Sequence, residues 1–103
     1  MAKYVYLYTG GKMADTPEEQ QQVMAAWGAW FGELGAAIID GGEPFGASTT
    51  VGADGAVSAG GASGVSGYTL ISADSLDAAA ALSKGCPVLA SGGAVEIYET
   101  IPM

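Results

Sequence analysis

The chain has 103 residues, and its formal net charge at pH 7 is -8, from eleven acidic residues against three lysines and no arginine. This acidity argues against binding to phosphate backbones or anionic lipids, so we expect neither nucleic acid nor a membrane as a partner. Because the chain contains no histidine, histidine-ligated metals and imidazole acid–base chemistry are excluded, and we expect no metal and no cofactor.

Length and cysteine usage bound the organisation of the chain. One domain over residues 1–103 is expected, with a core thin enough to favour a partner. No apolar run approaches about 18 residues, and an alternating pattern follows Lys3 where a secretory signal would have an apolar stretch. The single Cys86 has no intrachain disulfide partner and follows a predicted helix end, so an unreactive thiol is expected. These features predict a cytoplasmic protein.

The chain begins with a strand followed by a long helix. Tyrosines alternate with aliphatic and β-branched residues over residues 3–9, which predicts a strand. Thr16 supplies a helix N-cap, Pro17 the first helical position and Glu19 a capping-box carboxylate. The helix is predicted to end at about Leu34 or Ala37.

One face of this helix is apolar. Its apolar side chains recur at spacings of three and four residues, which predicts a stripe that packs on the sheet. Gly28 and Gly32 are spaced four apart, which is typical of close contact with a neighbouring backbone. The stripe consists of Val23, Trp27, Trp30, Leu34 and Ile38, widened by Met24 and Phe31.

The middle of the chain, residues 43–67, is rich in Gly, Ala, Ser and Thr. A β-branched cluster at residues 49–51 and the turn signal Asp54-Gly55 predict a weak strand with an irregular return over residues 56–59. The composition also resembles a flexible linker, so the conformation of this segment stays open.

The second half repeats the order of strand, helix and strand. Residues 66–73 alternate again, and Asp74 as N-cap with Asp77 at the third helical position starts an alanine-rich helix. Gly85 and Pro87 end that helix. Residues 94–101 are then predicted to form the last strand.

This order predicts an α+β fold of the ferredoxin-like βαββαβ type, with an antiparallel sheet and both helices on one face. We expect Val5 and Leu7 to pack under the helices, with Val95 and Ile97. Four tyrosines on the bare face would be too much aromatic area for water, so we predict a homodimer whose two sheets form a dimeric α/β barrel. The side chains expected on the bare face are Tyr4, Tyr6, Tyr8, Glu96, Tyr98 and Thr100.

The candidate site draws on the same aromatic residues. Tyrosine hydroxyls around Glu96 would form a partly enclosed polar place for a small molecule, and a carboxylate among aromatic rings suits acid–base work. The alternative is that these tyrosines only fill an interface. Asp40 is a second candidate acid or base, with a plain turn role as its alternative. The candidate ligand-binding residues are Tyr6, Tyr8, Trp27, Tyr68, Glu96 and Tyr98, and the catalytic candidates are Asp40 and Glu96.

Five segments that together span nearly the whole chain form a recognisable set. They are YVYLYTGG at 4–11, WGAWFGELG at 27–35, GYTLISADSLDAA at 67–79, KGCPVL at 84–89 and GGAVEIYETIPM at 92–103. As a set they resemble the YCII-related family, sometimes named for a DGPF tetrapeptide. The resemblance implies a ferredoxin-like dimeric α/β barrel and, for some relatives, catalysis through a His-Asp pair.

The chain departs from that family's pattern at the positions that carry its chemistry. The DGPF-like position corresponds to residues 59–62, which read AGGA, and no histidine is present to complete a His-Asp pair. Asp40 is the carboxylate that the resemblance associates with the family cleft.

Three functions stay open from the sequence. The first is a small homodimer that binds an organic molecule, either in a cleft between the sheet and the long helix or at the dimer seam. The second is an enzyme with carboxylate and tyrosine acid–base chemistry of the lyase, isomerase or cofactor-free oxygenase kind. The third is a purely structural interaction module. An enclosed cavity favours the first two, and a filled interior favours the third.

Overall fold

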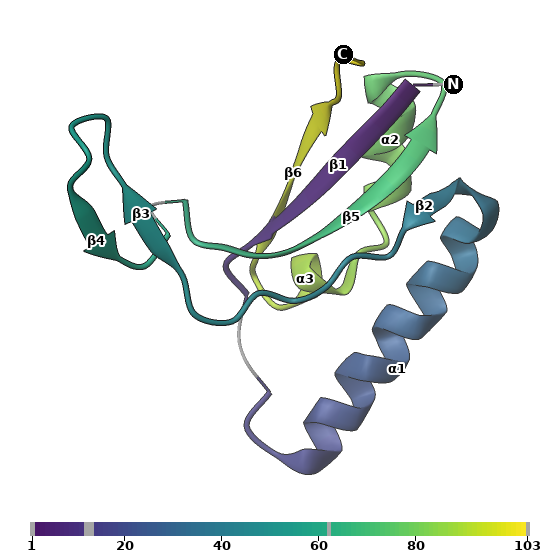
Figure 1. Ribbon diagram of the computed structural model, residues 1–103. Helices are drawn as coiled ribbons and strands as arrows, with labels where there is room; N and C mark the ends of the chain where they lie inside the picture. Colours follow the sequence, from purple (N-terminus) through teal and green to yellow (C-terminus); the bar gives the residue numbers. More distant parts are fainter. Residues whose placement is uncertain (1, 12–13, 62, 103) are drawn as a thin grey trace.

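The computed structural model describes residues 2–11, 14–61 and 63–102, which form an antiparallel sheet, a separate hairpin and a set of helices (Figure 1). The α+β class and the antiparallel sheet predicted from the sequence are confirmed. The elements are β1 (Ala2–Thr9), α1 (Pro17–Leu34), the short 3-10 helix η1 (Gly35–Ala37), β2 (Ile38–Asp40), β3 (Thr49–Val51), β4 (Val57–Ala59), β5 (Val65–Ala73), α2 (Leu76–Ser83), α3 (Pro87–Ala90) and β6 (Ala94–Glu99).

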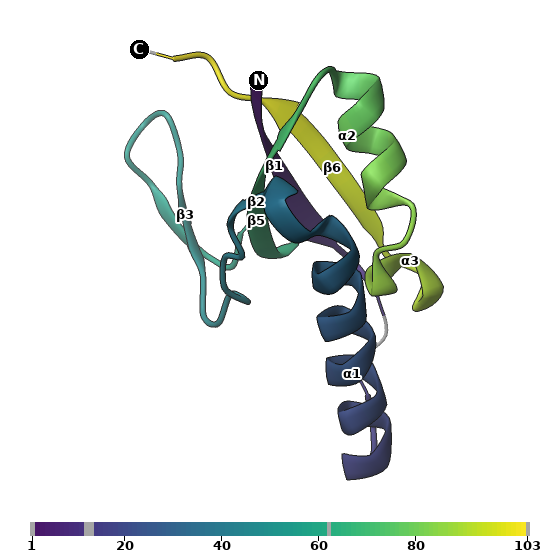
Figure 2. The ribbon, with the colours of Figure 1, turned by 90° about the vertical axis from the view of Figure 1, so that its right-hand side faces the viewer.

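The sheet has four strands in the order β2-β5-β1-β6, and the long strands β1 and β5 lie in its centre. Each neighbouring pair is antiparallel. Figure 2 shows the helices on one side of the sheet and the β3–β4 hairpin projecting on the other. The four strands form an open sheet and not a closed barrel. One face of the sheet is therefore covered by helices, and we call the opposite face the open face.

The direction of the β1 side chains is the reverse of the one predicted. Tyr4, Tyr6 and Tyr8 are buried on the helix-covered face, whereas Val5 and Leu7 lie half-buried on the open face. The prediction was wrong because both alternating sets of β1 are apolar, so hydrophobicity alone does not choose between them. Burial of Tyr6 and Tyr8 is possible because their hydroxyls find hydrogen-bond partners there.

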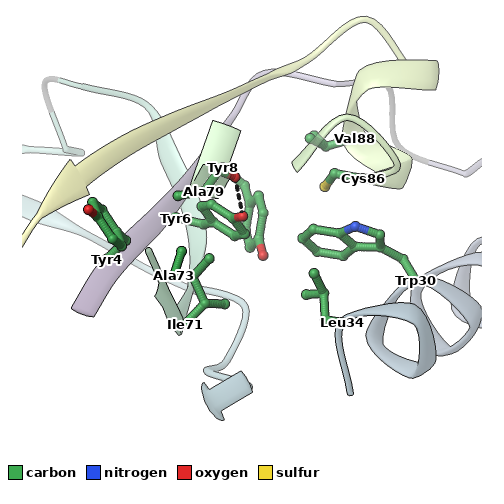
Figure 3. Close-up of a cluster of buried hydrophobic side chains, with 10 residues drawn as sticks. All are labelled: Tyr4, Tyr6, Tyr8, Trp30, Leu34, Ile71, Ala73, Ala79, Cys86 and Val88. Atoms are coloured by element: carbon green, nitrogen blue, oxygen red, sulfur yellow. Dashed lines mark hydrogen bonds between the residues drawn. The ribbon is translucent and has the colours of Figure 1, made fainter. Parts of the chain in front are cut away.

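Figure 3 shows the buried side chains among which Tyr6 and Trp30 lie. Tyr6 donates to the backbone carbonyl of Ala79 in α2, and its ring stacks on Trp30 at a centroid distance of 5.9 Å. Trp30 in turn donates its indole N–H to the carbonyl of Leu82 at 3.1 Å. Each large ring thus has both apolar packing and a satisfied polar group, which holds α1 and α2 against the sheet.

The second strand of the sheet differs from the one predicted. The sequence pattern placed it at residues 49–51 and continued the helical stripe to Ile38, but Ile38 belongs to β2 and pairs with Ile71 of β5. The helix ends at Leu34, and its C-cap Gly35 has a positive φ of 52°, which suits glycine and turns the chain toward the sheet edge. Strands β3 and β4 pair only with each other, around the predicted turn at Gly55.

Only the second half of α1 packs on the body of the protein. Trp30 and Leu34 are buried, but Val23 and Met24 are 44% and 74% exposed, so the predicted stripe holds only from Trp27 onward. The expected close backbone contact at Gly28 and Gly32 is also absent, because a Cβ at either position of the described chain would meet nothing within 4 Å. The first half of the helix therefore projects beyond the sheet (Figure 2).

The helix N-caps agree with the sequence for α1 and differ for α2. Thr16 accepts from the N–H of Glu19 as predicted, and the Glu19 carboxylate accepts from the backbone N–H of Asp15. In α2 the cap is Ser75 and not Asp74, since the Ser75 hydroxyl accepts from the N–H of Ala78. The two residue types compete for this role, and the chain enters the helix one residue later than expected.

Candidate functional site

A cleft of about 420 Å³ opens between the second half of α1, the first half of β5 and the loop that follows β2. Its walls come from segments far apart in the sequence, so it exists only when the sheet and α1 are assembled. The cleft is lined by the aromatic residues Tyr8, Trp27, Phe31 and Tyr68, by Gly41, Gly42, Glu43 and Pro44 of the loop, and by Ser66, Gly67, Thr69 and Val88.

The loop wall is held against β5 by two glycines. Gly42 has a φ of 74°, and a Cβ there would collide with the backbone of Tyr68. Gly67 pairs with Pro44 in an isolated antiparallel bridge, where a Cβ would lie 3.3 Å from the Pro44 Cα. Phe45 then donates its N–H to the Ser66 carbonyl at 2.8 Å. The loop consequently runs beside β5 as an extension of the short β2.

A relay of hydroxyl groups lines the base of the cleft. Tyr8 donates its hydroxyl to Thr69 Oγ1 at 2.7 Å, and Thr69 donates to the carbonyl of Gly41 at 2.9 Å. Burial raises the pKa of Tyr8 well above its ordinary value, so this hydroxyl stays protonated and remains a donor. The relay satisfies both buried hydroxyls and joins β1, β5 and the loop.

Three rings from β1 and α1 meet at steep angles along the cleft. Tyr8 and Trp27 have ring centroids 4.9 Å apart and planes at 81°, and Trp27 and Phe31 are 5.9 Å apart at 68°. Edge-to-face packing of this kind fixes ring orientation. Because Trp27 and Phe31 are only partly buried, they still present aromatic surface to the cleft.

Tyr68 borders the cleft, but its side chain lies on the open face, where it meets a carboxylate. The Tyr68 hydroxyl lies 3.5 Å from Asp40 Oδ2, and the negative charge of Asp40, followed by burial and the charge of Glu43, raises the pKa of Tyr68. Asp40 Oδ1 accepts from the N–H of Gly42 at 2.9 Å, which is the turn role considered for this residue.

The predicted site residues divide between the two faces of the sheet. Tyr6 does not line the cleft, because its ring is fully buried and stacks on Trp30. Glu96 and Tyr98 lie on the open face, where the Tyr98 hydroxyl donates to Glu96 Oε1 at 3.2 Å. Of the six ligand-binding candidates, Tyr8 and Trp27 meet in the cleft. Tyr68 borders the cleft, but its side chain lies on the open face with Asp40 beside its hydroxyl.

Sequence reasoning missed the loop that closes the cleft. Glu43 and Pro44 were assigned to a linker-like segment, and Val88 of α3 was not considered. One local signal was available, because Pro44-Phe45 after a glycine pair stands out in a stretch otherwise made of small residues. The position of the loop beside Gly67 depends on strand pairing and has no local signature.

Other positions singled out from the sequence lie away from this cleft. Cys86 is buried between α2 and α3, and burial raises its pKa to about 11, so the thiol stays protonated at neutral pH. Of the DGPF-like position at residues 59–62, Ala59 ends β4, Gly60 and Gly61 follow it, and Ala62 lies outside the described residues. Among the residues that the structure describes, no three metal-ligating side chains come together.

Comparison with known proteins gives no relative from which a role can be transferred. No family model matches the chain, and neither the curated proteins nor the solved structures include a significant match. Within the described ranges, no helix has both the length and the apolar character needed to cross a membrane.

Proposed function

We propose that this protein is a homodimer that binds a small organic molecule in the cleft between α1 and the sheet. The observation that carries the proposal is the cleft itself, which has about 420 Å³ of space and aromatic residues on several sides. Small-molecule sites are concave, mostly apolar and of this size, with a few polar groups at fixed positions. Here the polar groups are the Tyr8–Thr69 relay and the carboxylate of Glu43.

The open face of the sheet supports the dimer. The pairing of β1 with β5 places Val5, Leu7 and Leu70 together on that face. Tyr68 of β5 and Tyr98 of β6 lie beside them. Helices cover only the other side (Figure 2). An apolar sheet face without a cover is typical of an interface. A twofold pair of identical chains would bury the same patch twice, so the proposed occupant is a second copy of this chain.

The amount of exposed surface is also what a dimer subunit needs. The chain exposes 6810 Å², whereas a compact monomer of this mass exposes about 5,300 Å². Its radius of gyration is 15.0 Å, against about 13 Å for a compact domain of this length. The surplus of roughly 1,500 Å² exceeds the approximately 800 Å² that one partner contributes to a standard interface.

The hairpin of β3 and β4 supports the same arrangement. Its paired residues Val51 and Val57 are 63% and 70% exposed, and an isolated two-stranded hairpin is marginally stable in water. Contact with a second copy would give these side chains the apolar cover that they lack within one chain.

The proposal extends to the finer fold class and the family. The strand order β2-β5-β1-β6, with helices on one face, is compatible with the ferredoxin-like arrangement that the YCII-related resemblance implies. Pairing two such sheets through their open faces would give the dimeric α/β barrel.

Binding is favoured here over carboxylate-based catalysis by the positions of the candidate groups. Glu96 lies on the opposite face of the sheet from Tyr8, and Asp40 has one oxygen held by the Gly42 N–H. A general base needs to reach the proton that it removes, within about 3 Å or through one water. Neither Glu96 nor Asp40 is among the described residues that line the cleft.

A fluorescent ligand tests the proposed binding site directly. N-phenyl-1-naphthylamine is neutral, brightens in apolar surroundings and is small enough for the cleft. We expect saturable binding with one molecule per chain. Trp27→Ala removes one wall and should weaken binding by about tenfold, equivalent to about 1.4 kcal/mol. Absence of saturable binding by the unmodified protein would overturn the proposal.

A matched variant separates loss of the site from a general effect on α1. Met24 lies one turn before Trp27, is 74% exposed and does not line the cleft. Met24→Ala should therefore bind the probe as the unmodified protein does. Equal weakening by both variants would indicate that the probe binds the helix surface and not the cleft.

A further inference from the structure

We propose that the cleft selects organic cations, that is, small molecules in which an ammonium or quaternary ammonium group carries apolar substituents. This inference rests on the proposed binding function and specifies its ligand class. It follows from three properties of the described cleft: the aromatic walls, the prior use of its hydroxyl donors, and the sign of the charges around its mouth.

The aromatic walls supply the first attraction. Tyr8, Trp27 and Phe31 meet at angles of 81° and 68°, so their rings cannot all lie in one plane and instead enclose a corner. The faces of aromatic rings carry negative partial charge and attract a cation within about 6 Å of the ring centroid. A neutral apolar group of the same shape gains the contact but not this electrostatic attraction.

The hydroxyl groups of the cleft offer little to an anion. The proton of Tyr8 is directed to Thr69, and the proton of Thr69 is directed to the Gly41 carbonyl. An anionic ligand would need donors, and recruiting these two would break the relay that joins the loop to β5.

The charged side chain among the described residues that line the cleft is negative. Glu43, which is acidic, lines the cleft. No lysine is among the described residues that line the cleft, and the whole chain carries a net charge of -8. Such a field concentrates cations at the mouth and opposes the approach of anions.

Three ligands that differ mainly in charge test the selectivity. The cation is 4-(hydroxymethyl)phenyltrimethylammonium, its neutral isostere is 4-tert-butylbenzyl alcohol, and the anion is 4-(hydroxymethyl)benzoate. Each is titrated against the unmodified protein by isothermal calorimetry and by displacement of N-phenyl-1-naphthylamine. We expect the cation to bind about tenfold more tightly than its isostere, with the anion weakest.

The outcomes separate the two proposals. Equal or tighter binding of the neutral isostere would overturn cation selectivity while leaving a binding cleft. Failure of all three ligands and of the naphthylamine probe would overturn the binding function itself. Tighter binding of the anion than of the cation would also overturn cation selectivity while leaving a binding cleft.

Two charge variants show whether the charge at the mouth of the cleft causes the preference for the cation. Glu43 is exposed, so Glu43→Gln should fold normally, weaken the cation about threefold and leave the neutral isostere unchanged. Glu18→Gln changes the net charge equally but lies in the first turn of α1, away from the lining residues, and should have a smaller effect. Equal effects of the two variants would contradict local selection at the mouth.

Discussion

The two faces of the sheet differ in how completely they bury aromatic and aliphatic side chains. On the helix-covered face Tyr6 and Tyr8 are almost fully buried, and each hydroxyl has a hydrogen-bond partner. On the open face Val5 and Leu7 need no polar partner, yet they remain half-buried. A bulky polar ring can therefore be more completely buried than an aliphatic side chain when its hydrogen bond is satisfied, and the partly exposed aliphatic side chains mark the face on which we propose the dimer contact.

The largest loss of stability is expected when a buried ring is removed from the helix-covered face. Tyr6→Ala removes a fully buried ring that stacks on Trp30, so the free energy of unfolding should fall by about 3–5 kcal/mol. Tyr6→Phe keeps the ring and loses only the hydrogen bond to Ala79, for which about 1 kcal/mol is expected. Urea denaturation followed by tryptophan fluorescence measures both values. Similar losses in the two variants would show that the hydrogen bond, and not ring packing, dominates at this position.

A charge on the open face should break the proposed dimer while leaving the chain folded. Leu7 lies on that face opposite Tyr68 and Glu96, so Leu7→Lys would bury an ammonium group in the interface. We expect the dimer to dissociate with at least about a hundredfold larger dissociation constant, equivalent to about 2.7 kcal/mol. Light scattering should then give half the mass, with an unchanged circular dichroism spectrum.

The control for this variant keeps the apolar character of the position. Leu7→Met has nearly the same volume and should retain the dimer mass. A monomeric mass for the unmodified protein at micromolar concentration would refute the dimer outright.

Raising the pH tests the burial of Tyr6 on the helix-covered face without a substitution. Burial, with a smaller contribution from the charge of Cys86, raises the pKa of Tyr6 from its ordinary 10.0 to about 12. Because the folded state favours the protonated form, the associated stability is fully present below pH 10 and is lost as pH rises from 10 to 12. The loss due to this group should be on the order of 2 kcal/mol. In Tyr6→Phe, unfolding free energies measured across this window should decline less steeply, and an identical decline would contradict the assignment.

Much of the fold is visible in local sequence, and the exceptions share one cause. The strand at β1 and the start of α1 at Thr16 follow from alternation and capping, which are local signals. The face on which the tyrosines lie is not a local property, because both sides of β1 are apolar and the hydrogen bond to Ala79 spans 73 positions. Strand β2 has only three residues and follows the helical stripe without a break in hydrophobicity, so the stripe conceals it.

The cleft shows the same limit. The aromatic residues Tyr8, Trp27 and Tyr68 were proposed from their chemistry, but their grouping depends on how α1 crosses the sheet. Glu96 and Tyr98 were grouped with them only through the reversed direction of β1. The Glu43–Pro44 wall depends on a backbone pairing with Gly67 that composition does not encode. Residue types therefore suggested an aromatic site, and only the fold selected its members.

The smallest expected change in stability comes from a comparison of two glycines, Gly42, which packs against β5, and Gly28, which has no such contact. A Cβ at Gly28 would meet nothing within 4 Å, and glycine inside a helix costs about 0.5–1 kcal/mol relative to alanine. Gly28→Ala should therefore raise the melting temperature by about 2–8 °C. Gly42→Ala should instead destabilise the protein and weaken probe binding, since its φ is 74° and the new methyl group would collide with the backbone of Tyr68. If Gly28→Ala were destabilising, that side of α1 would have to be covered, and the projecting helix would then be a second contact surface of the assembled protein.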